Sequence, residues 1–525
     1  MVKKVLASAN RKTSTGAAAF LISGSYLLSQ LLGLVRDRLL ASHFGIVQLS
    51  DAYTAAFRLP DLLFTLLVSG ALAVAFIPIF TKHWVKDEHE QAWELTNDIL
   101  NFLIIGTIVL ALVCIVLADP LTHLITPGFD PERHALTVHL TRIMLATPLL
   151  FSVSSVLGSV QQAFQRFLVF ALSGVLYNVG IIVGIIFLAP SLSIYGVAYG
   201  VVIGAGLQAA VQLLGLVGLG YRYHFTLNWR NKNLHQVLKL MVPRSIDQGI
   251  DQINYIVETI IGSGLATGSL SAYYFANNLK NVPLVIFGTA ISTAAFPGLA
   301  AAAARGKTDQ IIEQLAANAR LILFFVIPSS AIIFIMRGYI IRLLFGFGNP
   351  TTASLLGWFI GVIIFQSLFF IVSRVYYALE DTRTPLYVSL FAITLNIFLS
   401  FWWSRRFGVA GLAMAQSLVA MLESIVLWVI LRQRLGHIGG GTILSGLVKI
   451  LTATGIMSLA VYLLVRILPL YRTDRGLLIV GPKFLAIAAA GLVAYLIPCY
   501  ILQLKEAKAF VSRLSDYINR SMNWF

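Results

Sequence analysis

The chain of 525 residues is poor in charge: Asp, Glu, Lys and Arg make up 11% of it, against 58% hydrophobic residues. Ordinary soluble domains carry about 25% charged residues, so a soluble globular protein is excluded. Acidic residues are scarcer than basic ones, with 22 Asp and Glu against 38 Lys and Arg, and the formal net charge is +16. We nevertheless expect no nucleic-acid partner, because the basic residues are spread over short connections between apolar runs.

Cysteine and clustered histidine are also scarce. The two cysteines, Cys114 and Cys499, lie in apolar stretches, which excludes a disulfide framework. The nine histidines form no His-x-x-x-His or comparable pair, and there is no Gly-rich Walker loop. We therefore expect no metal site, no bound cofactor and no enzymatic activity.

Apolar runs occupy most of the chain. A helix needs roughly 20 apolar residues to cross the hydrocarbon core of a bilayer, and windows of that length predict an all-α polytopic membrane protein of about fourteen transmembrane helices. The second and eighth spans are long enough to need a kink, which Pro60, Pro283 and Pro297 could supply.

The basic residues fall in alternate connections, and the positive-inside bias then places both termini in the cytoplasm. The turn between the last two spans departs from this bias, because Arg466, Arg472, Arg475 and Lys483 flank it on the outer side. Either these two spans are placed differently or the four residues contact anionic lipid headgroups.

Three short patterns recur along the chain in the same order. The pairs are Ala75–Pro78 with Ala294–Pro297, Gln162–Gln165 (leading to Asn178) with Tyr377–Glu380 (leading to Asn396), and Tyr195–Ala198 with Phe407–Ala410. This collinear repetition predicts two pseudo-symmetric six-helix lobes about a central site, as in transporters that alternate access across a membrane.

The predicted organisation has six parts. They are a cytoplasmic N-terminal segment (1–16), an N-lobe of spans one to six (17–218), a basic cytoplasmic linker (219–240), a C-lobe of spans seven to twelve (241–434), two C-terminal spans (435–503) and an amphipathic cytoplasmic helix (504–525). Apolar residues recur at helical spacing among charged ones in the last part, which is typical of a helix on a membrane surface.

Ionisable residues inside a span are costly, so each is a candidate for function. They concentrate on spans one, two, seven and eight, which are equivalent positions in the two halves. Guanidinium groups bind phosphate through paired hydrogen bonds, so Arg36 and Arg58 indicate an anionic, phosphorylated substrate. The alternative is that Arg36 and Asp37, near a span end, pair with neighbours or reach the headgroups. The candidate substrate-binding residues are Arg36, Asp37, Asp51, Arg58, Arg244, Asn278 and Lys280.

The seventh span carries three carboxylates on one helical face, Asp247, Asp251 and Glu258. They could pair structurally with Arg244, one turn before Asp247, or one of them could carry a coupling Na⁺ or H⁺. Asp251 is the better ion candidate because it lies deeper in the span.

Several motifs together resemble the MviN/MurJ lipid II flippases. They are Ser29–Asp37, Phe44–Gly45, Asp51–Tyr53, Phe57–Leu63, Gly70–Ala71, Ala75–Pro78, Thr126–Phe129, Tyr273–Tyr274, Asn278–Leu279 with Pro283, and Asp381–Pro385.

The resemblance implies the fold of the multidrug/oligosaccharidyl-lipid/polysaccharide exporter superfamily, with two extra C-terminal helices forming a lipid-facing groove. It also implies a multi-pass protein of the bacterial inner membrane that moves undecaprenyl-pyrophosphate-linked peptidoglycan precursor, lipid II, between leaflets. Arg36, Asp37 and Asp51 match cavity residues of the family. We expect a monomer whose partners are the bilayer and this substrate, reset by the membrane potential or a coupling cation.

This chain departs from the family at several cavity positions. The family has arginine where this chain has Gln30, Phe64 and Asn278, and glutamate where it has Ser69. Arg58, Lys280 and Arg244 could replace part of the missing charge.

A second departure concerns the ion site. Some relatives use a seventh-span carboxylate with an Asn-x-x-x-Asp pair in span eleven, and the matching pair here is Asn396 and Ser400. A weakened or relocated ion site is therefore expected.

Two other functions stay open. The missing arginines favour a flippase for another polyprenyl-pyrophosphate glycan. A cation-coupled exporter of small amphipathic drugs would have a cavity rich in aromatic and acidic residues, so Arg36 and Arg58 argue against it.

Overall fold

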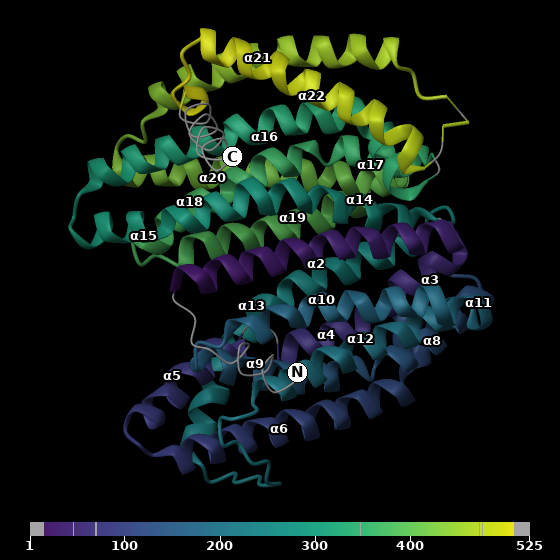
Figure 1. Cartoon of the computed structure of the whole chain (residues 1–525), viewed down its shortest axis with the longest axis vertical. Coiled ribbons are helices and arrows are strands. Elements are labelled where there is room, and N and C mark those ends of the chain that lie inside the picture. Colours follow the sequence, from purple (N-terminus) through teal and green to yellow (C-terminus); the bar gives the residue numbers. More distant parts are fainter. Residues whose placement is uncertain are drawn as a thin grey trace, which may run out of the picture. The chain divides into compact units, whose positions relative to one another are not determined.

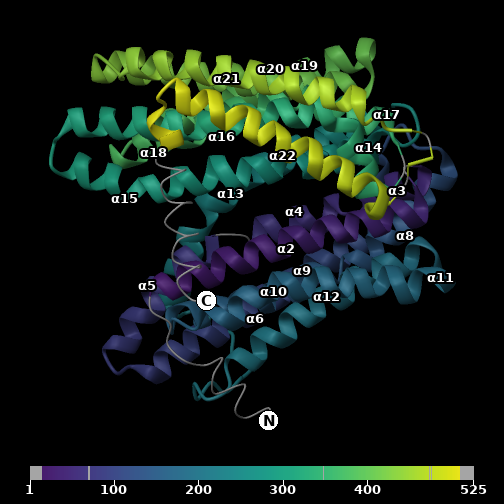
Figure 2. The same ribbon diagram turned by 45° about the horizontal axis from the view of Figure 1, so that its top comes forward.

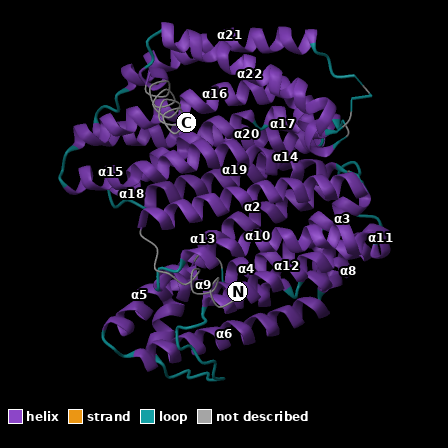
Figure 3. Cartoon of the chain, in the orientation of Figure 1, coloured by secondary structure: helices purple, strands orange, loops and turns teal. Residues whose placement is uncertain are grey.

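The computed structural model describes residues 15–45, 47–68, 71–346, 348–471, 473–474 and 476–508. Over these residues the chain is helical and contains no strand, as Figure 3 shows. Most of the predicted N-terminal segment and of the predicted amphipathic C-terminal helix lies outside the described residues. The side chains of Arg244 and Asp247 also lie outside them, so their predicted pairing stays a prediction.

The chain divides into two compact units, residues 1–271 and 272–525. The helices of the first unit are labelled in Figure 1. They are α2 (Thr15–Phe44), α3 (Gln48–Ala56), α4 (Arg58–Leu67), α5 (Ala71–Val85), α6 (His89–Val116), α7 (Ala118–Ile125), α8 (Pro131–Met144), α9 (Thr147–Ala163), α10 (Phe167–Val183), the π-helix η1 (Gly184–Leu188), α11 (Ala189–Leu192), α12 (Ile194–Gly215) and α13 (Lys232–Ser263).

The second unit takes most of α14 and all later helices. They are α14 (Ser269–Pro283), the π-helix η2 (Leu284–Thr289), α15 (Ala290–Ala304), α16 (Thr308–Phe345), α17 (Pro350–Trp358), α18 (Ile360–Ala378), α19 (Arg383–Phe407), α20 (Val409–Leu435), α21 (Gly440–Ile467) and α22 (Leu477–Ile501). Helices α21 and α22 pack on each other and on α16, which can be followed in Figure 2.

Eleven helical stretches of the described residues are long and apolar enough to cross a membrane. The all-α polytopic fold is confirmed, whereas the count of fourteen spans stays a prediction. Helices α2 and α13 have the length of a span, with 30 and 32 residues, but are not among the eleven. For α13 the reason is its charge, since it carries ionisable residues at intervals from Lys232 to Glu258.

Two of the three prolines expected to bend the long spans lie at helix boundaries. Pro60 lies in the first turn of α4, where a missing N–H costs little. Pro283 ends α14, and the chain continues as the π-helix η2 before returning to α-helix. Pro297 lies within α15.

The internal repetition recurs in the backbone of the two units. Gln165 after α9 and Glu380 after α18 both have positive φ, 58° and 60°. Ser193 before α12 and Gly408 before α20 share another uncommon conformation, with φ of 52° and 57° and ψ of −140° in both. Both pairs are 215 residues apart in the printed numbering.

Side-chain contacts repeat at the same offset. The amide Nε2 of Gln161 donates to the carbonyl of Gln212 at 2.8 Å, and the hydroxyl of Tyr376 donates to the carbonyl of Leu427 at 2.9 Å. These four positions again differ by 215. A duplicated six-helix plan accounts for both observations, because chance similarity of apolar sequences would not repeat buried polar contacts.

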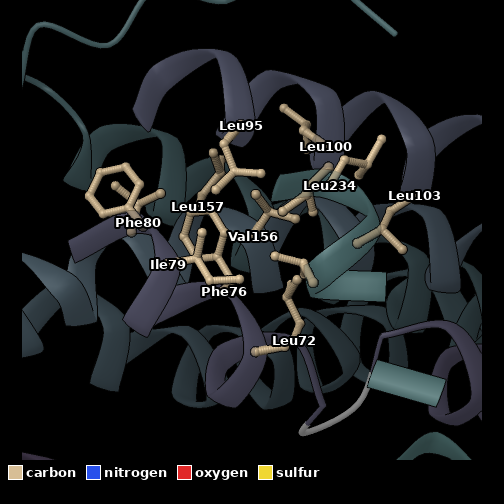
Figure 4. Packing of buried hydrophobic residues seen from close by; sticks show 14 of the residues in the cluster. Leu72, Phe76, Ile79, Phe80, Leu95, Leu100, Leu103, Val156, Leu157 and Leu234 are labelled. Atoms are coloured by element: carbon tan, nitrogen blue, oxygen red, sulfur yellow. The ribbon is translucent and has the colours of Figure 1, made fainter. Parts of the chain in front are cut away.

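The core of unit 1 shows where α13 belongs. Phe76 and Phe80 of α5, Leu95 of α6, Leu157 of α9 and Leu234 of α13 are buried in one cluster, which Figure 4 shows. The start of α13, which the sequence analysis divided between the linker and the C-lobe, therefore packs inside unit 1.

The first half of the predicted linker is an extended strap along α6. Tyr221 donates to Asn97 at 2.7 Å, Tyr223 donates to Asn101 at 2.8 Å, and the backbone N–H of Asn228 donates to Asp98 at 3.2 Å. The second half begins α13. The predicted lobe boundaries themselves stay predictions.

Candidate substrate and coupling site

Arg36 is held by polar side chains in unit 1. Its Nε and Nη2 donate to Oδ1 of Asp37 at 3.0 and 2.8 Å, and its Nη1 donates to Oδ1 of Asn178 on α10 at 3.2 Å. The Arg36 side chain is 16% exposed and that of Asp37 is 3% exposed. A guanidinium charge is thus kept in an apolar region by a carboxylate and an amide, and part of its edge remains accessible.

Asn178 is fixed in turn by α2 and by its own helix. Its Nδ2 donates to the carbonyl of Ser29 at 3.2 Å and to the carbonyl of Gly174 at 3.1 Å, which leaves Oδ1 directed at Arg36. In the sequence, Asn178 was identified only as part of the repeat. Its position as a polar residue in an apolar span was the signal for a functional contact.

Asp51 lies elsewhere in unit 1 and holds the start of α14. Its Oδ2 accepts from the backbone N–H of Gly268 at 2.6 Å, and its Oδ1 accepts from the N–H and the hydroxyl of Ser271, both at 2.8 Å. The first N–H groups of a helix have no partner within the helix, so a buried carboxylate there acts as a cap. Nη1 of Arg133 is 3.9 Å away.

The Thr126–Phe129 motif lies beside this cap. A Cβ on Gly128 would lie 2.4 Å from Cα of Gly264, so only glycine allows this approach between the α7–α8 loop and the α13–α14 turn. The N–H of Gly128 donates to the hydroxyl of Ser263 at 3.2 Å. Arg133, which the sequence analysis did not name, binds Asp130 at 2.8 Å and Thr267 at 3.1 Å.

Arg58 faces α13. Its Nε donates to Oγ1 of Thr259 at 2.7 Å, and its guanidinium lies 5.6 Å from the ring centre of Tyr255. Asn254 donates to the carboxylate of Glu258 at 3.0 Å. The charges of Glu258, Asp251, Arg58 and Asp61 all act on Tyr255.

We call Arg58, Asp61, Asp251, Tyr255 and Glu258 the α4–α13 cluster, because the four charged side chains act electrostatically on Tyr255. Asp61 lies within the Phe57–Leu63 motif and was not predicted as a site residue. Its carboxylate makes no hydrogen bond or ion pair with the described residues and lies in the electrostatic field of Arg58. Asp251 is exposed and Glu258 is buried.

Lys280 is a buried cation of unit 2. Its residue is 4% exposed, its Nζ donates to Oε1 of Gln416 on α20 at 2.5 Å, and it lies 4.5 Å from the ring centre of Phe359. Asn278 is half-buried on the same helix. Gln416 was not predicted, although it is a polar residue in an apolar span.

Asn396 and Ser400 lie one turn apart on α19, and both are buried. Within the described residues, the hydroxyl of Ser400 has no hydrogen-bond partner. The predicted ion-site residues thus belong to different units, Asp251 to the first and the α19 pair to the second, and their predicted cooperation stays a prediction.

Comparison with known proteins decides the family. A family model described as "Lipid II flippase MurJ" matches residues 40–479. The chain belongs to the MurJ lipid II flippase family. A curated relative, "Probable lipid II flippase MurJ" of Buchnera aphidicola, is 30% identical over 411 residues, covering 76% of this chain and 80% of the relative. Another of that name, from Bdellovibrio bacteriovorus, is 29% identical over 500 residues, covering 92% and 94%.

Solved structures show the same fold. "Lipid II flippase MurJ, inward closed conformation" matches with a TM-score of 0.77 at 22% identity, covering 92% of this chain and 98% of that chain. A multidrug resistance MATE family transporter of the MOP superfamily, in an inward-facing conformation, matches with a TM-score of 0.65 at 14% identity, covering 78% and 94%. The predicted exporter-superfamily fold is confirmed.

Gln30 and Phe64, two positions at which the chain departs from the motifs of the MurJ resemblance, each contact a neighbouring aromatic residue. Gln30 is exposed and its Nε2 donates to the hydroxyl of Tyr26 at 3.0 Å. Phe64 packs against Phe151, with ring centres 5.1 Å apart. An aromatic pair thus occupies the position at which the resemblance implies an arginine, so Phe64 supplies apolar contact there.

Proposed function

We propose that this chain moves lipid II from the inner to the outer leaflet of the bacterial inner membrane by alternating access. The observation that carries the proposal is membership of the MurJ family over residues 40–479. Arg36 is held by hydrogen bonds to Asn178 and Asp37 in an otherwise apolar region. Its guanidinium can donate paired hydrogen bonds to the oxygens of a diphosphate. The activity is transport, with no catalytic step.

The carboxylate of Asp37 competes with the diphosphate of the substrate for the guanidinium of Arg36. Two N–H groups of the guanidinium are occupied by its carboxylate, so a diphosphate must displace or share that contact. Asp37 is buried, and a displaced buried carboxylate is costly. Asp37 therefore keeps the affinity for the anion low enough for release, and its return to Arg36 follows departure of the cargo.

We place the coupling cation, Na⁺ or H⁺, at the α4–α13 cluster. Asp61, Asp251 and Glu258 all act electrostatically on Tyr255, as Arg58 does. Carboxylates on membrane-spanning helices are the groups that commonly carry protons or coupling cations. The Asn396–Ser400 pair of unit 2 is the alternative site that the family resemblance suggests, and the membrane potential is the alternative energy source.

We also propose that the chain acts as a monomer with both termini in the cytoplasm. This orientation rests on the basic residues of alternate connections.

The test measures outer-leaflet lipid II in cells depleted of their own flippase and expressing this chain. We expect restored exposure with the wild type and loss with Arg36→Ala. Losing charged hydrogen bonds to phosphate costs about 1.5–3 kcal/mol each, or about 10–100-fold in binding. The matched control is Arg38→Ala, two residues along α2, which should retain transport. Normal transport by Arg36→Ala at wild-type expression would refute the site.

One observation favours a second cargo. Gln30, Phe64 and Asn278 stand where the family pattern has arginine, so the site holds less positive charge. A correctly inserted chain that fails to expose lipid II but flips another polyprenyl-pyrophosphate glycan would establish that reading.

A further inference from the structure

Unit 2 carries a belt of basic side chains stacked on aromatic rings at one end of its helices. The pairs are Arg337 over Phe334, Arg405 over Phe401, Arg406 over Trp402, Arg466 over Tyr462 and Lys483 over Tyr471, at 4.2 to 5.9 Å from the ring centres. In four of them the ring precedes the cation by three or four residues, which puts both on one face of a helix.

The pairs share one end of the unit. They lie in the C-terminal third of α16, near the ends of α19 and α21, and in the turn before α22 and its first turns. Arg342 near the end of α16 donates to the carbonyl of Tyr471, and Tyr339 donates to the carbonyl of Leu468, so α16 meets the α21–α22 turn. Figure 1 shows this turn and the α16–α17 junction at the same end.

The aromatic rings are open to the surroundings. All five residues are at least 46% exposed. Large apolar residues next to the belt are exposed as well, among them Leu463 and Ile467 on α21 and Leu478 and Leu485 on α22. In a protein that spans a membrane, such faces meet acyl chains, and exposed aromatic residues mark the level of the headgroups.

Charge at this end is almost wholly positive. Asp474 is the acidic residue of the α21–α22 turn, and its carboxylate binds Lys483 at 2.7 Å and the N–H of Tyr471 at 3.0 Å. These contacts, the Lys483 hydrogen bond first, hold the pKa of Asp474 below its ordinary value. Arg405, Arg406 and Arg466 make no ion pair with the described residues, and the same turn also contains Arg472 and Arg475 in sequence.

We propose that this belt binds the phosphate groups of anionic phospholipids. A guanidinium near the face of a ring retains N–H groups that match phosphate oxygens, although Arg466 donates one of its own to the hydroxyl of Tyr462 at 2.6 Å. On the proposed orientation the belt faces the outer leaflet, where basic residues run against the positive-inside bias; this placement rests on the proposed function. Headgroup binding accounts for basic residues being kept there, since it fixes α21 and α22 in the leaflet.

The experiment uses the full chain in nanodiscs of phosphatidylcholine with a minor fraction of phosphatidylglycerol. Phospholipid that remains bound after transfer to detergent is extracted and quantified. Each basic residue near an anionic surface contributes about 1 kcal/mol, or about fivefold in affinity. The wild type should retain phosphatidylglycerol selectively, and the triple variant Arg405→Gln, Arg406→Gln, Arg466→Gln should lose on the order of a hundredfold in affinity.

The matched control is the triple variant Arg305→Gln, Arg383→Gln, Arg432→Gln. These three exposed arginines lie after α15, at the start of α19 and near the end of α20, outside the belt, so this variant should retain the lipid. Lysine at the three belt positions should restore most of the retention, which separates charge from misfolding. Equal loss in both triple variants, or no selectivity in the wild type, would overturn the proposal.

A competition arm distinguishes the phospholipid from the cargo. Undecaprenyl diphosphate added at a concentration equal to that of phosphatidylglycerol should leave the retained phospholipid largely unchanged. Complete displacement would assign the belt to the diphosphate of the cargo instead and refute the phospholipid site. Because no lipid II is present, a failure of flipping would not affect this result.

Discussion

Replacing Asp51 distinguishes a structural cap from a cargo contact. Its two carboxylate oxygens accept the N–H groups of Gly268 and Ser271, all within buried surroundings. A buried N–H left without a partner costs about 1–3 kcal/mol. Asp51→Ala removes both acceptors and should cost about 2–6 kcal/mol, whereas Asp51→Asn keeps one acceptor oxygen and should cost about 1–3 kcal/mol.

Ser271→Ala gives the matched mild change. It removes the hydroxyl that donates to Asp51 at 2.8 Å and keeps both backbone contacts, so about 1 kcal/mol is expected. The assay is the apparent melting temperature of the purified chain in detergent, followed with lipid II binding. We expect the smallest fall in melting temperature for Ser271→Ala, a larger fall for Asp51→Asn and the largest for Asp51→Ala. An unchanged melting temperature in Asp51→Asn with lost lipid II binding would refute the cap and support the predicted cargo role.

Three further changes test other parts of the structure. Gly128→Ala should lower the melting temperature, because the added Cβ would lie 2.4 Å from Cα of Gly264 and overpacking costs about 1–3 kcal/mol or more. The control is Gly106→Ala, which should leave the melting temperature unchanged because no atom lies within 4 Å of the added Cβ. Backbone hydrogen bonding from Thr384 holds the pKa of Asp381 below its ordinary value, so its stabilisation is present above that value and is lost as pH falls through the lowered pKa. Asp381→Asn should therefore lower the melting temperature at neutral pH and match the wild type in acid; a constant difference would contradict this. Lys280→Met keeps the stem and removes the charge and the donor to Gln416, so lipid II transport should fall and the stability should drop by about 1–3 kcal/mol. Unchanged transport would exclude a cargo role.

The internal duplication was visible in sequence only through short apolar matches. In the structure it appears in features that composition does not explain, such as the shared backbone conformation of Ser193 and Gly408. The contacts of Gln161 and Tyr376 occupy equivalent positions with different side chains, so sequence comparison alone could not pair them. A hydrogen bond to a carbonyl can be kept while the residue that donates it changes.

Sequence by itself determined the membrane class, the helical fold and the family motifs. Hydrophobic length and charge placement are properties of each segment, so they can be read before folding. It also singled out Arg36, because an arginine in an apolar run needs a reason.

Only the tertiary structure decided what those residues contact. Asp51 and Gly268 are 217 positions apart, and Arg36 and Asn178 are 142 apart. A buried charge takes its role from the donors and acceptors that the fold brings to it, and no local pattern specifies a partner at that separation. For this reason the capping of α14 by Asp51 could not be read from the sequence, and its expected cavity role stays a prediction. Asn178 and Gln416, not expected at any site, were found to accept hydrogen bonds from Arg36 and Lys280.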